Sequence, residues 1–386
     1  MIRPTDKIQE AKKMNPVLTD DQSLEEVISC MADNIPLKTQ GNCDQRMIFK
    51  ILARAAGAGD SIENTCKTLL DVPCGNNIRY HLEKYNDMNT LETQINNAIH
   101  DRLPPRIING RQRIAIDLNL IPYYGVPTPA EKPYIIRSKA KAGTCSFYAY
   151  ATVYVIKKGK RVTLAITVVR RDDTDVFIIT RLLDKISALN FKVKCLYIDR
   201  GFFSVPVIRW LKALGIPFEL PAVIRGKKGG TRRLLRGGGS YKTVYTMKSW
   251  KYGSVTFDIW IVCVYSKGKY GRHGIRYFAY AVYKIPLNLR AIHKDYRKRF
   301  GIETSYRLKN QCRIKTVTKN PVMRLLFMGI AYIIKDIWVY LTWKYVSYPR
   351  KGGRRLFHNL FPLKLMLMFL RQAVDRKHQA ADAVYL

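Results

Sequence analysis

The chain has 386 residues, of which 47% are hydrophobic, so it can bury a substantial core and is not a charged, unfolded tail. Its 67 Lys and Arg residues outnumber 29 Asp and Glu, and the formal net charge of +38 favours a polyanionic partner. Eight scattered cysteines without a CxxC pair argue against a zinc site or a disulfide framework and favour a reducing cytosol.

The charge is unevenly distributed along the chain. Residues 1–105 carry 12 basic and 15 acidic side chains, whereas residues 106–386 carry 55 basic and 14 acidic ones, a net of +41. The C-terminal part is therefore expected to meet the polyanion. Carboxylates are scarce enough there to be considered one by one.

The first 105 residues are predicted to form a helical N-terminal DNA-binding domain, and the opening "MIRPTDKIQEAKK" does not have the pattern of a signal peptide. In "SIENTCKTLLDVPCGNNIRYHLEKY" (61–85), an amphipathic stretch is followed by a turn at 71–75 and a second helix that carries Arg79 and Lys84. This is the outline of a helix-turn-helix, for which an ordinary pair of packed helices is the alternative. Pro104–Pro105 is a plausible linker.

The pattern changes to strands from Arg113. In "RIAIDLNLI" the aliphatic residues alternate, which predicts a strand with Asp117 on its opposite face. Residues 145–170 predict two more strands, and a helix capped by Thr174 then leads into the strand "VKCLYID", which ends at Asp199. A helix capped by Ser204 follows. This order predicts a mixed α/β layer.

Residues 225–284 interrupt that layer. Nine Lys and Arg lie between residues 225 and 251 without a single acid, and two aromatic, strand-like runs follow, which predicts a basic β-rich insertion. Helices resume at about 285 and continue through a C-terminal helical segment, 346–386, that is interrupted near Pro349–Gly353. The apolar run "LLFMGIAYII" (325–334) is shorter than the roughly 18–20 residues of a membrane span, so it predicts a core helix and no membrane partner.

Most carboxylates of the C-terminal part lie at predicted helix starts or on helix surfaces, and a few lie in loops or in the insertion, where the sequence suggests no role. Three others are candidates for a functional site. Asp117 lies in mid-strand, and Asp199 ends a strand at the edge where α/β sheets place their sites. A carboxylate at such a position needs a compensating positive charge. A salt bridge could provide it, and Arg200 is adjacent to Asp199. A divalent metal ion is the other possibility. Glu303 lies in "YRKRFGIETSYRLKN" (296–310), where one continuous helix would align it with Tyr296, Arg299, Arg307 and Asn310. A solvated Arg–Glu–Arg ladder is the alternative for Glu303.

These three acids, in "IAIDLNLIPYYG", "YIDRGFF" and "YRKRFGIETSYR", resemble the catalytic acids of DDE transposases from bacterial and archaeal insertion sequences. The resemblance is greatest to the group with a β-strand insertion between the second Asp and the Glu. That interval is 104 residues here. The resemblance covers about residues 110–345 and implies an RNase H-like mixed sheet with flanking helices, formed by 106–224 and 285–345 around the insertion 225–284. Such proteins often have a Lys seven residues after the Glu, where this chain has Asn310 with Lys309 adjacent.

The resemblance implies metal-dependent cleavage of DNA at insertion-sequence ends and strand transfer into target DNA. Asp117, Asp199 and Glu303 would hold two Mg²⁺ ions, with Mn²⁺ as a substitute. The implied partners are double-stranded DNA and a second copy of the chain in a synaptic homodimer, in the cytoplasm at the nucleoid. The expected DNA contacts are Tyr296, Arg299, Arg307, Lys309, Arg200, Arg232, Arg233, Arg236, Arg79 and Lys84.

Two other functions remain open at this point. One is a catalytically silent, domesticated DNA-binding protein, although an intact set of three acids argues against it. The other is an RNase H-like nuclease that cuts without joining. Aromatic residues of the insertion could hold bases that leave the stack. Trp250 is a candidate for this role, but a buried structural tryptophan is the preferred interpretation.

Overall fold

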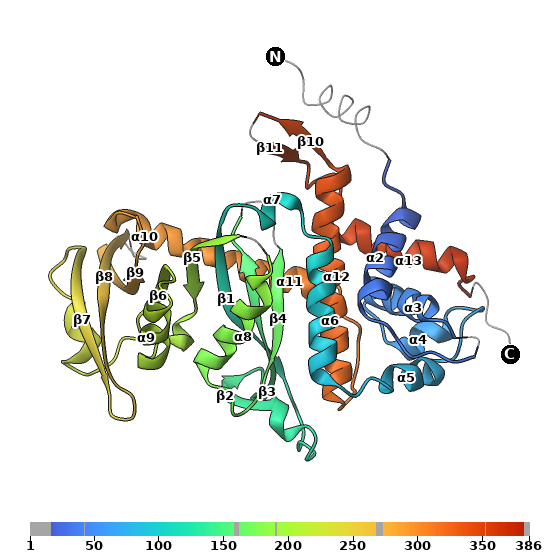
Figure 1. Cartoon of the computed structure of the whole chain (residues 1–386), viewed down its shortest axis with the longest axis horizontal. Helices are drawn as coiled ribbons and strands as arrows, with labels where there is room; N and C mark the ends of the chain where they lie inside the picture. Colours follow the sequence, from blue (N-terminus) through green and yellow to red (C-terminus); the bar gives the residue numbers. More distant parts are fainter. Residues whose placement is uncertain are drawn as a thin grey trace.

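A nine-stranded sheet flanked by helices forms the centre of the protein (Figure 1). The computed structural model describes residues 17–41, 43–157, 162–189, 191–267, 273–351 and 353–381. The strands of the sheet are β1 (Arg111–Pro122), β2 (Ile135–Lys141), β3 (Thr144–Val155), β4 (Thr163–Val169), β5 (Lys192–Ile198), β6 (Phe218–Pro221), β7 (Tyr241–Ser249), β8 (Gly253–Lys267) and β9 (His273–Tyr283). Their order is β2-β3-β1-β5-β6-β9-β8-β7, and β4 pairs with β3.

The strands β1, β3, β4, β5 and β6 have the RNase H-like arrangement that the sequence predicts. Strand β3 is antiparallel to both β1 and β4, whereas β1, β5 and β6 run parallel to one another. Helices α8 (Asp175–Ser187) and α9 (Val205–Ala213) make the crossovers between β4, β5 and β6. Because β1 and β5 are parallel neighbours, the residues at their carboxyl ends lie at the same edge of the sheet.

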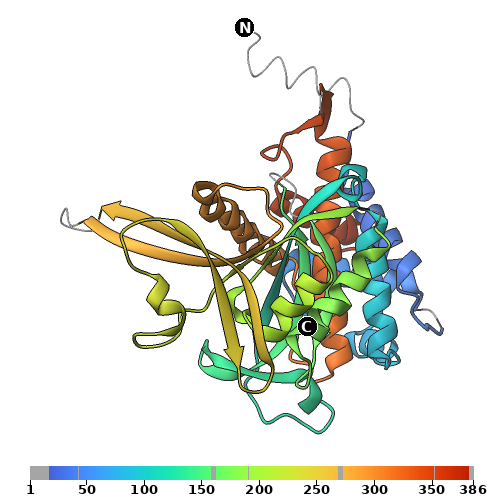
Figure 2. The same ribbon diagram turned by 60° about the vertical axis from the view of Figure 1, so that its left-hand side comes forward.

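The strands of the insertion do not form a separate sheet. Strand β9 pairs antiparallel with β6, and β8 and β7 follow, so the insertion extends the central sheet at one side. Figure 2 shows these strands, coloured yellow to orange, projecting from the body of the protein as a curved ribbon. Alternate residues of β8, Val255, Phe257, Ile259 and Ile261, are buried on one face. The opposite face is exposed at Ser254, Thr256 and Asp258, whereas Trp260 and Val262 farther along it are buried.

Helices from both ends of the chain pack together beside the sheet. Helix α13 contacts α2 and α3, and α12 contacts α6. Ion pairs join the two ends of the chain: Arg376 lies 2.9 Å from Asp20, and Arg54 lies 2.9 Å from Asp375. The helices involved are α2 (Asp20–Asn34), α3 (Gln45–Ala58), α4 (Ile62–Lys67), α5 (Gly75–Glu83), α6 (Met88–Asp101), α7 (Pro105–Ile108), α12 (Pro321–Tyr345) and α13 (Leu363–Lys377).

Helix α12 is the central helix of this packing. By length and composition it could cross a membrane, but 94% of its most apolar stretch is buried inside the protein. Its Lys335 and Asp336 form an ion pair of 2.5 Å that is also buried. At Gly329 the helix approaches α6 so closely that a Cβ atom would lie 2.5 Å from Cδ1 of Ile95. Helix α12 is therefore a buried core helix.

Two segments differ from the predicted helices. Residues 296–310 are not one α-helix, because the 3-10 turn Arg297–Phe300 separates α10 (Leu289–Tyr296) from α11 (Gly301–Gln311). The C-terminal segment begins with a two-stranded hairpin, β10 (Ser347–Arg350) and β11 (Gly353–Leu356), before α13. Proline lacks a backbone donor and disfavours helix in the residue before it, which explains why α12 does not continue through Pro349.

Candidate active site

Asp117 lies in the middle of β1, as the alternation of its neighbours predicts. It pairs with Thr152 of β3, and its Oδ1 accepts a hydrogen bond of 2.9 Å from the backbone N–H of Leu118. The side chain is only 17% exposed. This carboxylate therefore needs a nearby positive charge or a proton.

Asp199 directly follows β5 and lies beside Asp117. Ile116 of β1 pairs with Ile198 of β5, so each acid comes one residue after a paired position on adjacent parallel strands. Asp199 caps the 3-10 turn Arg200–Phe202, and its Oδ2 accepts a hydrogen bond of 3.3 Å from the N–H of Gly201. Local turn geometry and strand register together fix its position.

Arg299 connects the two aspartates. One guanidinium nitrogen donates to Oδ1 of Asp199 at 2.8 Å, and another lies 3.3 Å from Oδ2 of Asp117. The side chain is buried, with 7% exposed. The residue predicted as a phosphate contact is therefore the counter-ion of the two acids, a role that the sequence suggested for Arg200. The 3-10 turn that interrupts the predicted helix carries Arg299 to this edge.

The electrostatics of Asp117 link all three acids. Burial raises the pKa of Asp117 to about 6; Arg299 opposes this rise, and the carboxylates of Asp199 and Glu303 add to it. Glu303 is an exposed residue in the first turn of α11, which packs against β1. The third acid thus belongs to the same electrostatic cluster, although it comes from a different element.

Three carboxylates provide hard oxygen ligands, the type that Mg²⁺ and Mn²⁺ prefer. Within the described part of the chain, no three His, Cys, Asp or Glu side chains are close enough together to enclose a metal ion. The guanidinium of Arg299 contacts both Asp117 and Asp199. The donor set fits a divalent ion that would take over this neutralising role.

Two of the predicted DNA contacts are largely buried. Tyr296 is buried, and its hydroxyl donates a hydrogen bond of 3.1 Å to the carbonyl of Ile198, one residue before Asp199. Lys309 has 0% exposure, and its ammonium lies 5.5 Å from the ring centroid of Tyr332. Tyr296 supports the end of β5, and Lys309 belongs to the core, because α11 turns this side toward α12. Arg307, on the same helix, is exposed.

A cleft of about 500 Å³ is lined by Arg200, the residue after Asp199, and by Tyr296. Its basic side chains are Arg200, Arg276 and Arg297, of which only Arg200 was predicted as a DNA contact. The aromatic side chains of the cleft are Tyr277, Phe278, Tyr280, His293, Tyr296 and Phe300. The other two arginines could not be singled out in a sequence with 67 Lys and Arg residues. The combination of cations and ring faces suits phosphates and bases.

The predicted contacts of the insertion lie on the surface. Arg232, Arg233 and Arg236 are exposed, with Arg232 held by a hydrogen bond of 2.7 Å to the carbonyl of Gly226. Trp250 is fully exposed at the turn between β7 and β8, so the expectation of a buried structural tryptophan is wrong. Trp250 lies in the three-residue turn between Ser249 and Gly253, outside the paired residues of β7 and β8.

The predicted helix-turn-helix corresponds to α4 and α5, with the second helix beginning at Gly75. The two residues predicted to contact DNA from this segment already have partners within the protein. Arg79 lies 3.1 Å from Glu63, and Lys84 donates a hydrogen bond of 3.1 Å to Gln40. A DNA contact by Arg79 or Lys84 would have to replace these interactions.

Comparison with known proteins places the chain in a family. The model of the family described as "Transposase DDE domain" matches residues 109–328, which is more than half of the chain and includes Asp117, Asp199 and Glu303. No curated protein matches the chain. Among solved structures, a chain of the piggyBac transposase synaptic complex with hairpin DNA is similar, with a TM-score of 0.54, 12% sequence identity, and 97% of this chain and 84% of that chain covered. At this identity the structural likeness concerns the fold. The chain belongs to the transposase DDE domain family.

Proposed function

We propose that this protein is a DNA transposase that cleaves DNA at the ends of an insertion sequence and joins those ends to target DNA. One observation carries the proposal: Asp117 and Asp199, on adjacent parallel strands, share the guanidinium of Arg299. Glu303 lies on α11, which packs against β1, and all three acids lie inside the region that matches the family.

Asp117, Asp199 and Glu303 are proposed to hold the divalent metal ions, Mg²⁺ or Mn²⁺. Such ions, when bound, activate an attacking oxygen and stabilise the leaving oxygen of a phosphodiester. Tyr296 keeps the end of β5 in place through its hydrogen bond to Ile198. Arg299 neutralises Asp117 and Asp199 without a metal, and we expect its guanidinium to turn to a DNA phosphate when a metal takes its place.

Double-stranded DNA is the proposed partner. The cleft with Arg276 and Arg297 is also lined by Arg200, the residue after Asp199, and we propose that it binds DNA phosphates. The structural neighbour is a synaptic complex with hairpin DNA, which supports a synaptic assembly, proposed here as a homodimer. We place the protein in the cytoplasm, associated with the nucleoid.

Trp250 on the projecting insertion is the candidate to stack on an unpaired base.

The decisive experiment measures cleavage and joining of a labelled DNA that carries the flanking element end, with an unlabelled target and Mg²⁺. We expect wild type to cut and join, and Asp199→Asn and Glu303→Gln to do neither while still binding the DNA. Asp258→Asn, a matched change at an exposed position of β8, is expected to behave as wild type.

Other outcomes separate the competing functions. Cutting without joining under all metal conditions would identify a nuclease. Binding without cutting by wild type, in both Mg²⁺ and Mn²⁺, would identify a silent DNA-binding protein. Activity of Asp199→Asn equal to that of wild type would reject the proposed site.

A further inference from the structure

The hairpin β10–β11 projects from the C-terminal end of α12 (Figure 1). It lies outside the residues that match the family, and it was not among the predicted DNA contacts. From residue 337 to residue 374 the sequence has no Asp or Glu, while it has seven Lys and Arg residues. The hairpin is therefore the centre of an acid-free segment.

Strand alternation divides the hairpin into two faces. Ser347 pairs with Leu356, and Pro349 pairs with Arg354, so these four residues share one face. That face is directed back to the protein. Arg354 donates hydrogen bonds to the hydroxyl of Ser347 at 2.6 Å and to its carbonyl at 3.1 Å, and its guanidinium lies 5.3 Å from the ring centroid of Trp343 in α12.

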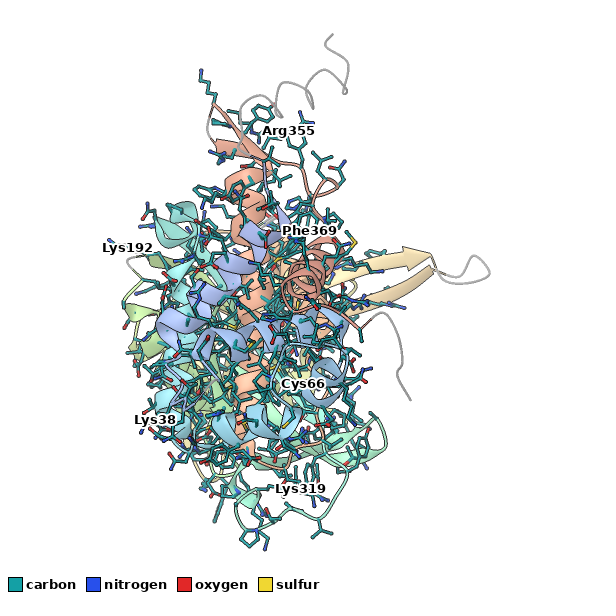
Figure 3. All side chains as sticks on the ribbon, turned by 90° about the vertical axis from the view of Figure 1, so that its right-hand side faces the viewer. Lys38, Cys66, Lys192, Lys319, Arg355 and Phe369 are labelled. Carbon is teal, nitrogen blue, oxygen red and sulfur yellow. The ribbon has the colours of Figure 1, made fainter. Side chains whose placement is uncertain are left out.

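The opposite face combines arginines with aromatic rings. Tyr348 pairs with Arg355, and Arg350 follows on the same face. The ring of Tyr348 stacks on that of Phe357, with centroids 5.7 Å apart, and the guanidinium of Arg355 lies 5.5 Å from the Phe357 ring. Arg350, Arg355 and the turn residue Lys351 are exposed. Figure 3 shows Arg355 near this projecting end of the molecule.

The basic side chains of the outer face have no acidic partner. Within the part of the chain that the structure describes, no ion pair involves Arg350, Lys351 or Arg355, whereas nearby Lys344 lies 2.9 Å from Glu26 and Arg371 lies 3.3 Å from Asp375. The hairpin itself is well fixed, because the N–H of Phe357 donates to the carbonyl of Val346 at 3.0 Å and closes its base. Three cations are thus held outward on a rigid support.

We infer that the outer face of β10–β11 is a second DNA-binding element, in which Arg350, Lys351 and Arg355 contact phosphates of a duplex. Guanidinium groups match phosphate oxygens in bidentate geometry, and a two-stranded ribbon is narrow enough to lie along a DNA groove. Helix α12 contacts both the hairpin and α11, the helix that carries Glu303. The inference rests on the proposed function in taking DNA as the partner, but not on the catalytic acids.

The test is binding of the full-length protein to a fluorescent random-sequence duplex in EDTA, so that no cleavage contributes. The salt dependence is measured between about 50 and 200 mM KCl. The test variant is Arg350→Gln/Lys351→Gln/Arg355→Gln. The matched control, Arg111→Gln/Lys192→Gln/Lys194→Gln, removes three exposed charges from the starts of β1 and β5; Figure 3 shows Lys192 far from Arg355.

We expect the slope of log affinity against log salt to be smaller by about 2 to 3 in the hairpin variant, since each lost phosphate contact removes about 0.9. Affinity at low salt falls roughly tenfold or more, and the control variant keeps the wild-type slope. Equal slopes for both variants would overturn the inference. Retained DNA binding with loss of self-association in sedimentation would also overturn it, and would make the hairpin a protein contact.

The cleavage assay distinguishes failure of the hairpin proposal from failure of the proposed transposase function. A hairpin variant that binds and cleaves as wild type would reject the hairpin alone. A wild-type protein that neither binds nor cleaves duplex DNA would reject both proposals.

Discussion

Arg299 donates a hydrogen bond of 2.8 Å to Asp199, the acid that follows β5, and the same guanidinium lies 3.3 Å from Asp117. The arginine therefore holds the position between two carboxylates that a divalent cation would otherwise neutralise. Since burial raises the pKa of Asp117 to about 6 even with Arg299 beside it, loss of the guanidinium would leave the Asp117 carboxylate either uncompensated or forced to take up a proton.

We predict that Arg299→Ala lowers the free energy of unfolding in EDTA by about 3 kcal/mol, because removal of one partner leaves a buried charge unpaired. Mg²⁺ should then raise the melting temperature of the variant more than that of wild type, since the ion replaces the lost positive charge. Thermal unfolding with and without MgCl₂ measures both effects.

Arg299→Lys is the matched control, because it keeps the charge but not the planar fork, and we expect it to lose less stability. Equal melting temperatures for wild type and Arg299→Ala in EDTA, together with equal responses to Mg²⁺, would show that Arg299 does not compensate the acids.

Trp250 is exposed at the tip of the β7–β8 turn, so its removal should not affect the core. We predict that Trp250→Ala changes the free energy of unfolding by less than about 0.5 kcal/mol. Binding to DNA with an unpaired base should weaken by about 1–3 kcal/mol, the usual contribution of one base–aromatic stack. Val244→Ala, at an exposed apolar position of the adjacent strand β7, should change neither quantity. Loss of stability in Trp250→Ala without loss of affinity would contradict this role.

Local patterns predicted the strands that carry the acids. The alternation around Asp117 and the apolar run before Asp199 depend only on neighbours in the sequence, and both residues lie where those patterns place them. The RNase H-like order also follows from the sequence of elements. These features do not require knowledge of distant contacts.

Other parts of the site depend on contacts between distant segments. A single 3-10 turn after Tyr296 decides that Arg299 reaches the aspartates, and nothing in "YRKRF" distinguishes it from a continuous helix. Extension of the sheet by the insertion depends on pairing of β6 with β9, about 60 residues apart. The burial of Lys309 depends on where α11 meets α12.

Lys309 has an ammonium group without a hydrogen-bond partner among the described residues. Burial, helped by nearby Arg313, lowers the pKa of Lys309 to about 7. Between that value and the ordinary pKa of 10.5 the unfolded chain binds more protons than the folded chain, so stability rises with pH over this window. At lower pH the folded state keeps the full cost of the buried charge.

We therefore predict that Lys309→Met raises the free energy of unfolding by about 1–3 kcal/mol at pH 6, with a smaller gain at pH 10. DNA affinity should not change, because the side chain is buried. Urea denaturation at both pH values and the duplex-binding assay measure these outcomes. Lys319→Met, at an exposed position, should have no effect on stability. A loss of DNA affinity in Lys309→Met would restore the predicted phosphate contact.

Glu219, in the middle of β6, gives the opposite pH dependence. Both of its carboxylate oxygens are buried without a hydrogen-bond partner in the described part of the chain. Burial, followed by the charge of Asp295, raises the pKa of Glu219 to about 8 from 4.5. Between these values the folded chain keeps a proton that the unfolded chain releases, so stability falls as the pH rises from 4.5 to 8.

The side chain introduced by Glu219→Gln cannot ionise. We predict that this variant is more stable than wild type at pH 8 by a few kcal/mol, and that the difference disappears near pH 4.5.

Glu131→Gln is the contrasting variant. Glu131 is also buried, but it accepts hydrogen bonds from the N–H and hydroxyl of Thr128 and from the hydroxyls of Tyr123 and Tyr148, which lower its pKa although burial alone would raise it. That variant should lose stability at pH 8. Thermal unfolding of both variants at pH 5 and pH 8 measures the difference, and a destabilised Glu219→Gln at pH 8 would mean that the Glu219 carboxylate is ionised and compensated in the folded protein.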